Sequence, residues 1–500
     1  AHNNLGNLLR EFGQLDEAIN SYKNALNTKP DYLEVLYSLG LTFEELGSLD
    51  EMIEYLQLAV ELEPNLVEAH NKIGQGLEKL DRFDEAIFSY QRAIEINPDF
   101  SEAYNNLGNI LKECNRYDEA IIYYLKALKI TPDYPALHNN LGNAYRENGK
   151  PYEAIRSYEN ALASNPDLPE SHNNLGLVFF ELGQLDNALK SFKLAIKNRP
   201  SYDEAHNNLG SVFVTLNLLD EALKSFSMAI KISPDFDDAY NNIGNIFLAL
   251  NQTEDAIKSY KKTIALNPDF AAPHNNLGNA FKAIGKLDEA VLSYKKAIEL
   301  SPTFAEAFNN LGSLLSKEMN ELDKGVIYFK KAIQINPDFE VAHNNLGNAL
   351  FKLNHFEDAL TSYSNALNLD CDSNYIYGNI LNTKMSYCNW NDFHNQIKEL
   401  NLRINNKEKT IEPFVLMGLI DKPDLQRQVT EIRINNEHPR RYLLPDINPY
   451  PKHPKIRIGY FSADFREHPV GYLTAGLYEL HDRDHFEIHA FSFGIASNDE

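Results

Sequence analysis

At 500 residues the chain is longer than one hydrophobic core usually supports, so several domains or an extended repeat array are expected. A formal net charge of −24 argues against nucleic-acid binding, and a mean hydropathy of −0.42 without any apolar run of about 18 residues argues against membrane residence. Three cysteines without a CxxC pair exclude a disulfide framework and favour a reducing, cytoplasmic location.

A repeat of 34 residues organises the chain from its first residues to about Asp370. Its clearest mark is a glycine in each predicted first helix, and the spacing lengthens once to 35 because the stretch 317–321 carries an extra residue. The glycines are Gly6, Gly40, Gly74, Gly108, Gly142, Gly176, Gly210, Gly244, Gly278, Gly312 and Gly347. A small residue about twelve positions later, usually alanine, lets a second, antiparallel helix pack closely. A proline then ends the second helix because it lacks the backbone donor.

Each predicted second helix also carries a bulky aromatic residue between two alanines. Glycine, alanine, aromatic, alanine and proline at these offsets are the tetratricopeptide pattern, and it occurs eleven times. We therefore predict a mainly α fold, a right-handed αα superhelix over residues 1–370, closed by a degenerate capping repeat over 371–402. Departures such as Met52, Leu56, Thr263 and Gly325 are expected to be tolerated packing variants.

An asparagine stands two residues before most of these glycines. First helices of such a solenoid are expected to line a concave binding surface. Because asparagine is a poor helix former and its amide both donates and accepts, the row is a candidate clamp for a peptide backbone. The predicted binding residues are Asn106, Asn140, Asn174, Asn208, Asn242, Asn276, Asn310 and Asn345. The alternative is that these amides bond to each other or to water and merely pin the repeats.

A second asparagine row lies three residues further on, on the same helical face. Its members are Asn7, Asn109, Asn143, Asn245, Asn279 and Asn348. Histidines two residues before the first row exchange with tyrosine or phenylalanine from repeat to repeat, which indicates a packing position. We predict no metal site there, because helices 8–10 Å apart cannot bring one nitrogen each to within about 2 Å of an ion.

The pattern changes after residue 402. Residues 403–454 form a predicted Pro-rich connector with short helices, one of them over about 424–435. Residues 455–462 and 486–493 are predicted strands and 470–481 a helix, which together make a right-handed βαβ unit at the start of an α/β domain over 455–500. His468, before Pro469, would stand at the helix N-terminus, where it could act as acid or base or bind an anion.

The motifs of this segment resemble the O-linked N-acetylglucosamine transferase family with its SPINDLY-type relatives, most of all bacterial members. The likeness rests on the stretch 457–465 (RIGYFSADF), the pair His468 and Pro469, the stretch 480–483 (LHDR), and Cys388 and Trp390 at the junction. The resemblance implies an incomplete Rossmann-like lobe of GT-B type, and it identifies His468 with the family's active-site histidine. Tyr472 replaces a second histidine of the animal enzymes, which puts acceptor handling in doubt.

This resemblance implies a protein that transfers N-acetylglucosamine from UDP-GlcNAc to Ser or Thr of acceptor proteins, without a metal. Most of the donor site would lie outside this chain, which alone is expected to be inactive. Acceptor proteins or extended peptides are the expected partners, and a homodimer through the repeats is a further expectation. The alternatives are a non-catalytic scaffold for protein–protein interaction, or a related transferase that uses GDP-fucose or UDP-glucose.

Overall fold

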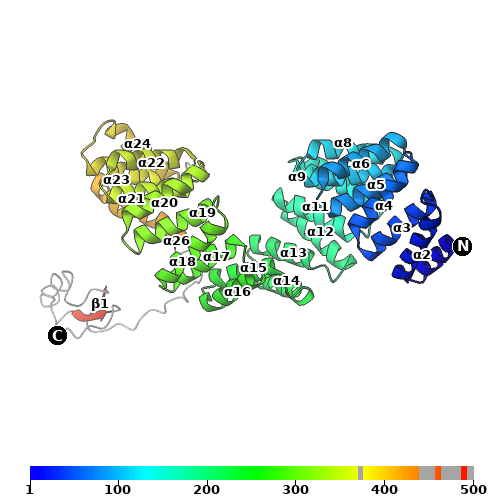
Figure 1. The fold of residues 1–500 in the computed structure, drawn as a ribbon. Coiled ribbons are helices and arrows are strands. Elements are labelled where there is room, and N and C mark those ends of the chain that lie inside the picture. Colours follow the sequence, from blue (N-terminus) through cyan, green and yellow to red (C-terminus); the bar gives the residue numbers. More distant parts are fainter. Residues whose placement is uncertain (370–374, 438–455, 463–485, 493–500) are drawn as a thin grey trace. The chain divides into compact units, whose positions relative to one another are not determined.

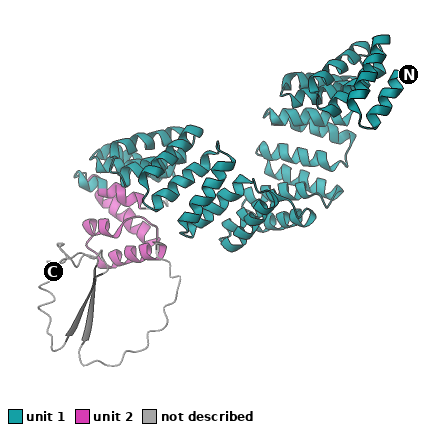
Figure 2. Cartoon of the chain, turned by 60° about the horizontal axis from the view of Figure 1, so that its bottom comes forward, with its two compact units in different colours: residues 1–371, 383–389 teal, residues 372–382, 390–500 magenta. Residues whose placement is uncertain are grey.

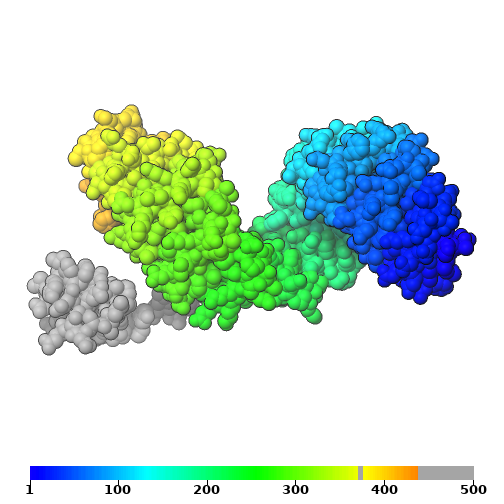
Figure 3. All heavy atoms as spheres, in the orientation of Figure 1, coloured from blue at the N-terminus to red at the C-terminus, as the bar shows by residue number. Residues whose placement is uncertain are grey.

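The computed structural model describes residues 1–369, 375–437, 456–462 and 486–492. They separate into two compact units, one of residues 1–371 with 383–389, the other of 372–382 with 390–500 (Figure 2). The first unit consists of helix pairs that follow one another in sequence order (Figure 1). Colours along it pass in sequence order in the space-filling view, as expected when each repeat packs on its neighbours (Figure 3).

Eleven helix pairs make up this unit. The first helices of the pairs are α1 (His2–Glu11), α3 (Leu33–Leu46), α5 (Val67–Lys79), α7 (Ser101–Glu113), α9 (Pro135–Glu147), α11 (Pro169–Glu181), α13 (Asp203–Thr215), α15 (Asp237–Ala249), α17 (Ala271–Ala283), α19 (Ala305–Lys317) and α21 (Glu340–Lys352). The second helices are α2 (Leu15–Thr28), α4 (Leu49–Leu62), α6 (Phe83–Ile96), α8 (Tyr117–Ile130), α10 (Pro151–Ser164), α12 (Leu185–Asn198), α14 (Leu219–Ile232), α16 (Thr253–Leu266), α18 (Leu287–Leu300), α20 (Leu322–Ile335) and α22 (Phe356–Leu369). The predicted array of helix pairs is confirmed over the described residues 2–369.

Local chemistry ends the helices where the repeat pattern predicts. Each second helix from α2 to α20 stops two residues before its proline, and the residue between is extended, as Lys29 is at φ −143°. The turn between the helices of a pair contains one left-handed residue, which is glycine, asparagine or aspartate. Gly149 (φ 69°) and Asn217 (φ 57°) are examples of the residue types that adopt this conformation most easily.

The repeating glycine exists to admit the aromatic ring of the second helix. A Cβ atom at Gly142 would lie 2.5 Å from Tyr158 Cε1, and one at Gly176 would lie 2.7 Å from Phe192 Cε1. Both rings are fully buried, as are the alanines on either side of each ring. Close helix packing through small residues is therefore confirmed, and each ring fills the space between the two helices.

The extra residue near 317–321 falls in the turn between α19 and α20, where Asn320 takes the left-handed conformation. This repeat also carries Gly325 in place of the usual alanine, and the reason is its neighbour. A Cβ atom at Gly325 would lie 2.1 Å from Ser316 Oγ, so the serine side chain occupies the space that alanine fills elsewhere.

The C-terminal helices are α23 (Ile376–Ser386), α24 (Phe393–Asn405), α25 (Pro413–Leu419) and α26 (Pro423–Glu437). The predicted helix over 424–435 is confirmed by α26. One buried cluster in the second unit joins Leu381, Leu400, Ile411, Leu416 and Val429. Residues on both sides of position 402 therefore share one core, so the expected capping repeat and the first part of the expected connector pack together.

Two strands are described further along the chain, β1 (Ile456–Ser462) and β2 (Phe486–Ser492). They pair in parallel, with Ile456 opposite Phe486 and Ser462 opposite Ser492. This agrees with the predicted strand positions and direction. The predicted helix 470–481, the loop with His468 and residues 438–454 of the Pro-rich connector lie outside the described residues. None of the helices in the described part combines the length and hydropathy that a transmembrane segment requires.

Candidate functional site

The predicted asparagine row lies in the second turn of the first helices. We call these side chains the ladder asparagines: Asn106, Asn140, Asn174, Asn208, Asn242, Asn276, Asn310 and Asn345. Asn345 is buried and the other seven are half-buried. From α5 to α21, first helices of successive repeats contact one another directly. Such contacts are what a solenoid curved toward its first helices requires.

Each ladder asparagine donates a hydrogen bond into the preceding repeat. The acceptor is Oδ1 of the asparagine just before the preceding ladder position. The Nδ2 to Oδ1 pairs are Asn106 to Asn71 (3.1 Å), Asn140 to Asn105 (3.0 Å), Asn174 to Asn139 (3.2 Å), Asn208 to Asn173 (3.0 Å), Asn242 to Asn207 (3.0 Å), Asn276 to Asn241 (3.1 Å), Asn310 to Asn275 (3.0 Å) and Asn345 to Asn309 (3.0 Å). The alternative prediction, that neighbouring amides bond to each other, is therefore correct for the Nδ2 group of every ladder asparagine.

The break in the row at Ser38 shows what these bonds do. Ser38 stands where a ladder asparagine would donate to Asn3. Asn3 Oδ1 is buried there and has no hydrogen-bond partner among the described residues. A buried polar atom without a partner is costly, so the regular ladder bond satisfies its acceptor in the other repeats.

Asparagines of the second row are held by the buried tyrosines. Tyrosine hydroxyls donate to their Oδ1 atoms in the pairs Tyr22 to Asn7 (2.7 Å), Tyr124 to Asn109 (2.7 Å), Tyr158 to Asn143 (2.6 Å), Tyr260 to Asn245 (2.8 Å), Tyr294 to Asn279 (2.7 Å) and Tyr363 to Asn348 (2.9 Å). Burial raises the pKa of these tyrosines, which keeps each hydroxyl protonated as a donor. Three of these Oδ1 atoms also accept from the ladder asparagine of the next repeat: Asn109 from Asn140 (3.3 Å), Asn143 from Asn174 (3.0 Å) and Asn245 from Asn276 (3.1 Å). The second row therefore has a structural role within repeats and between them.

The sequence itself indicates this pairing of tyrosine with asparagine, through residue types that change together at the two positions. Wherever the second-row residue is asparagine, the buried ring is tyrosine. Where the ring is phenylalanine, asparagine is absent, as in the pairs Leu177 with Phe192, Ser211 with Phe226 and Ser313 with Phe329. A buried hydroxyl needs an acceptor and a phenyl ring does not, so the two positions vary together.

The ladder face keeps unused hydrogen-bonding capacity. Among the described residues, no donor contacts Oδ1 of Asn140, Asn174, Asn208, Asn242, Asn276 or Asn310, and no acceptor contacts Nδ2 of the second-row asparagines. The face therefore offers acceptors in one row and donors in the next. A peptide backbone presents the complementary N–H and C=O groups.

A small hollow of about 170 Å³ opens on this face where the pattern changes to phenylalanine. It is lined by Ser211 and Val214 of α13, Phe226 of α14, and Asn242 and Asn245 of α15, with three further apolar side chains. Ser211 is smaller than the asparagine it replaces, and Phe226 has no hydroxyl to fill the space. A hollow of this kind can take one apolar side chain of a bound segment.

Five of the histidines beside the ladder contact the backbone. Their Nε2 atoms lie within hydrogen-bond distance of the carbonyl oxygen of the proline six residues earlier: His70 with Pro64 (3.0 Å), His138 with Pro132 (2.8 Å), His172 with Pro166 (2.9 Å), His206 with Pro200 (3.1 Å) and His343 with Pro337 (3.0 Å). These contacts fix the inter-repeat turn. They support the prediction of a packing role.

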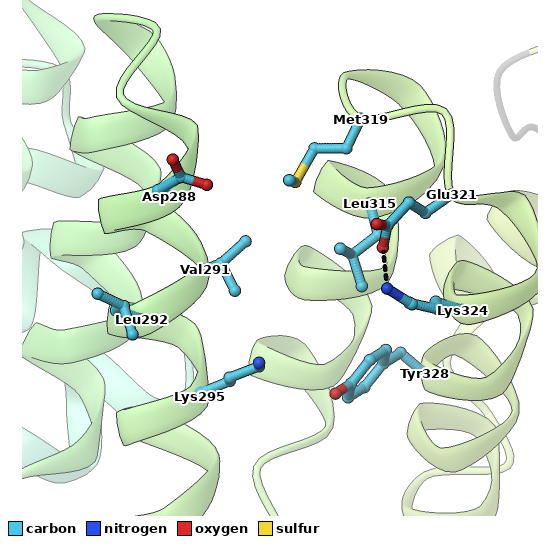
Figure 4. A pocket seen from close by; sticks show the side chains of 9 residues that line it. All are labelled: Asp288, Val291, Leu292, Lys295, Leu315, Met319, Glu321, Lys324 and Tyr328. Carbon is cyan, nitrogen blue, oxygen red and sulfur yellow. Dashed lines mark ion pairs between the residues drawn. The ribbon is translucent and has the colours of Figure 1, made fainter.

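A second hollow, of about 350 Å³, lies between α18 and α20, at the repeat with the inserted residue. Figure 4 shows Val291 of α18 across this space from Leu315, while Met319 reaches in from the lengthened turn. Glu321 and Lys324 at its edge pair with each other at 2.8 Å. The hollow lies beside the turn that carries the inserted residue, and no ladder side chain lines it.

The fold and the face described above define a solenoid of helix pairs with an amide-lined surface. A family model described as TPR repeat matches residues 6–47, 108–149, 142–183, 176–217, 211–250, 244–285 and 278–318, together more than half of the chain. Models described as tetratricopeptide repeat match residues 33–66, 67–100, 89–122, 305–339 and 341–373. The chain belongs to the tetratricopeptide repeat proteins.

Among solved structures, one that matches is described as "Crystal structure of MamA". It shares 32% sequence identity with this chain, and the match covers 32% of this chain and 94% of that one, with a TM-score of 0.32. No curated protein matches the chain. Repeats of this family are suited to protein–protein interaction, because stacked helix pairs build extended binding surfaces.

Proposed function

We propose that the repeat array binds an extended segment of a partner protein along the ladder face and acts as an interaction scaffold. The observation that carries this proposal is the row of six ladder Oδ1 atoms, from Asn140 to Asn310, that no protein donor in the described part of the chain contacts. Their Nδ2 atoms are fixed by the preceding repeat, so the free oxygens are held in place before a partner arrives. Such preorganisation lowers the entropic cost of binding.

The chemistry of the face favours recognition of a backbone over recognition of particular side chains. Backbone N–H and C=O groups recur in every residue of an extended peptide, so regularly repeated amides can bind many sequences. The hollow beside Phe226 adds a preference for an apolar side chain at one register. We therefore still propose that the ladder asparagines bind a peptide backbone, and we assign this binding to their Oδ1 atoms.

The test replaces Asn174, Asn208, Asn242 and Asn276 together by alanine in the whole chain. The probe is a neutral peptide of Ser, Thr, Pro and Ala that is already extended, and its binding is measured by calorimetry. We expect at least tenfold weaker binding, because several backbone hydrogen bonds of about 1 kcal/mol each are lost. Circular dichroism should show unchanged helicity.

A matched control separates binding from stability. Replacing Asn173, Asn207, Asn241 and Asn275 by alanine removes inter-repeat hydrogen bonds while keeping the ladder side chains. This control should lower the unfolding midpoint about as much as the ladder variant but weaken peptide binding less. Equal affinity of the ladder variant and the unchanged protein would refute the proposal.

The finer function that we propose is the acceptor-binding arm of a protein O-GlcNAc transferase, or of a related transferase that uses GDP-fucose or UDP-glucose. Support comes from the motifs over 457–483 and from the parallel pairing of β1 with β2, an arrangement common to α/β domains. His468 would serve the reaction there, and acceptor proteins would reach it along the ladder face. UDP-GlcNAc is the proposed donor, with no metal.

Donor hydrolysis by the longest natural protein that contains this chain tests the finer proposal. UDP- and GDP-sugars are offered singly, and release of the free nucleotide is measured with the unchanged protein and with His468→Ala. Hydrolysis of UDP-GlcNAc that falls at least tenfold in the variant is expected, which is the low end for the loss of an acid–base group. No hydrolysis of any donor would leave the scaffold as the function.

A further inference from the structure

Seven residues after each ladder asparagine, at the end of the first helix, the charge changes sign along the array. We call these residues the helix-end column: Glu113, Glu147, Glu181, Thr215, Ala249, Ala283, Lys317 and Lys352. Positions seven apart lie two turns apart on the same helical face, so the column runs beside the ladder. Lys317 Nζ confirms the proximity, because it donates to Oδ1 of the ladder residue Asn345 at 3.2 Å.

The acidic end spans α7 to α11. Burial is the main cause of the raised pKa of Tyr124 and of Tyr158. Glu147 and Glu113 raise the pKa of Tyr124 further, while Arg146 lowers that of Tyr158 and Glu147 and Glu181 raise it. Lys112 and Arg146, one position before the column, offset part of this negative charge. These tyrosine hydroxyls bond to second-row asparagines, so the acids stand at the edge of the ladder face. All three glutamates are exposed and available to a partner.

The basic end spans α17 to α21. Lys282, one position before the column, and Lys352 both lower the pKa of Lys317, after burial as the first cause, while Glu318 acts in the opposite direction. Lys282 and Lys352 therefore lie close enough to Lys317 for their positive charges to act on it, and Glu318 opposes them in part. Like charges held together without full compensation are stabilised when an anionic partner arrives.

The two ends act independently of each other. Thr215, Ala249 and Ala283 separate Glu181 from Lys317 by four repeats, and packed helices lie about 8–10 Å apart, so the ends are on the order of 30 Å apart. This exceeds the Debye length of about 8 Å at physiological ionic strength. The ends therefore do not neutralise one another, and each presents its own charge to a bound segment.

We infer that the ladder face takes an extended partner segment of asymmetric charge, with acidic residues over Lys282, Lys317 and Lys352 and basic residues over Glu113, Glu147 and Glu181. This inference rests on the proposed binding of extended segments and adds their direction. Backbone contacts to the ladder hold the segment, and the charged ends decide which way it lies. A segment of opposite direction would place like charges together, which is unfavourable.

The experiment uses the whole chain and two peptides with the same neutral, extended middle. One peptide is neutral throughout, and the other has glutamates at one end and lysines at the opposite end, with a photo-crosslinking group beside the glutamates. Crosslinks of the charged peptide should fall on α17 to α21. In a triple variant, Lys282→Glu, Lys317→Glu and Lys352→Glu, its affinity at low salt should fall at least tenfold and these crosslinks should be lost.

A matched control reverses three exposed lysines of second helices, Lys190→Glu, Lys193→Glu and Lys224→Glu, and changes the net charge equally. The control should bind the charged peptide as the unchanged protein does, and all three proteins should bind the neutral peptide alike. Equal losses in both triple variants, or crosslinks spread evenly along the array, would overturn the inference. Failure of the unchanged protein to bind the neutral peptide would instead overturn the proposed scaffold function.

Discussion

Repeats with a buried tyrosine and repeats with a buried phenylalanine solve the same packing problem in two ways. In the α9–α10 pair, Tyr158 fills the space beside Gly142 and its hydroxyl binds Asn143. In the α11–α12 pair, Phe192 fills the same space beside Gly176, and Leu177 replaces the asparagine. The difference teaches that one polar atom in the core determines the residue type on the ladder face, because the hydroxyl must have an acceptor.

The same difference explains where the ladder face is polar and where it is not. Tyrosine repeats bring a second amide to the surface, and phenylalanine repeats bring a small or apolar side chain. The hollow beside Phe226 lies at a phenylalanine repeat for this reason. Substitutions on either side of the pair test this explanation, beginning with the largest expected effect.

Loss of the whole ring should cost about the same in both kinds of repeat. Tyr158→Ala and Phe192→Ala should each lower the free energy of unfolding by about 3–5 kcal/mol, since both rings are fully buried and leave a cavity. Urea unfolding of the whole chain measures the effect. A much larger loss for the tyrosine alone would show that the hydroxyl, not the ring, holds the repeat together.

Adding a hydroxyl without its acceptor should be the next largest effect. Phe192→Tyr should destabilise the chain by about 1–3 kcal/mol, because Leu177 cannot accept the new hydrogen bond. Adding Leu177→Asn should recover most of this loss, which a double-mutant cycle measures. Tyr158→Phe serves as the control and should cost only about 1 kcal/mol. No coupling between positions 177 and 192 would contradict the explanation of the two repeat types.

Completing the ladder at its break should give the smallest change, and one of opposite sign. Ser38→Asn places a donor where the buried Asn3 Oδ1 has no partner among the described residues, and should stabilise the chain by about 1 kcal/mol. Local protection of α1 and α3 by hydrogen exchange should rise with it. A neutral or destabilising outcome would indicate that water already satisfies Asn3 or that the larger side chain does not fit.

Much of the fold follows from residue types that are each needed for a local reason. The proline after each second helix and the glycine opposite each ring allowed the helix pairs to be predicted. The boundary at residue 402 is different, because Leu381 and Leu400 share a core with Leu416 and Val429, and no repeat marks that packing. The glycine at position 325, which leaves room for the side chain of Ser316, likewise depends on a contact between helices and cannot be deduced from spacing.

The ladder was located from the sequence, but its internal bonds were not. The asparagine just before each ladder residue received no role in the sequence analysis, yet it accepts the hydrogen bond from the next repeat, as the buried Asn173 does from Asn208. The two asparagines differ in the direction in which their side chains leave the helix. Which direction faces a neighbouring repeat depends on how the repeats stack. The pairing of asparagine with tyrosine was visible in the sequence as a correlated exchange between two positions.

The ladder hydrogen bonds join residues 35 positions apart, and this spacing affects how the number of repeats can change. Each bond joins a ladder asparagine to the residue just before the equivalent position one repeat earlier. In the repeats from α7 to α21, removing or duplicating a whole repeat therefore leaves every ladder donor opposite a suitable acceptor. The insertion near Asn320 was absorbed in the same way, since Asn345 bonds to Asn309 across 36 residues at 3.0 Å. This part of the array can therefore change length by genetic duplication while its ladder hydrogen bonds are kept, which makes the length of the binding face an adjustable trait.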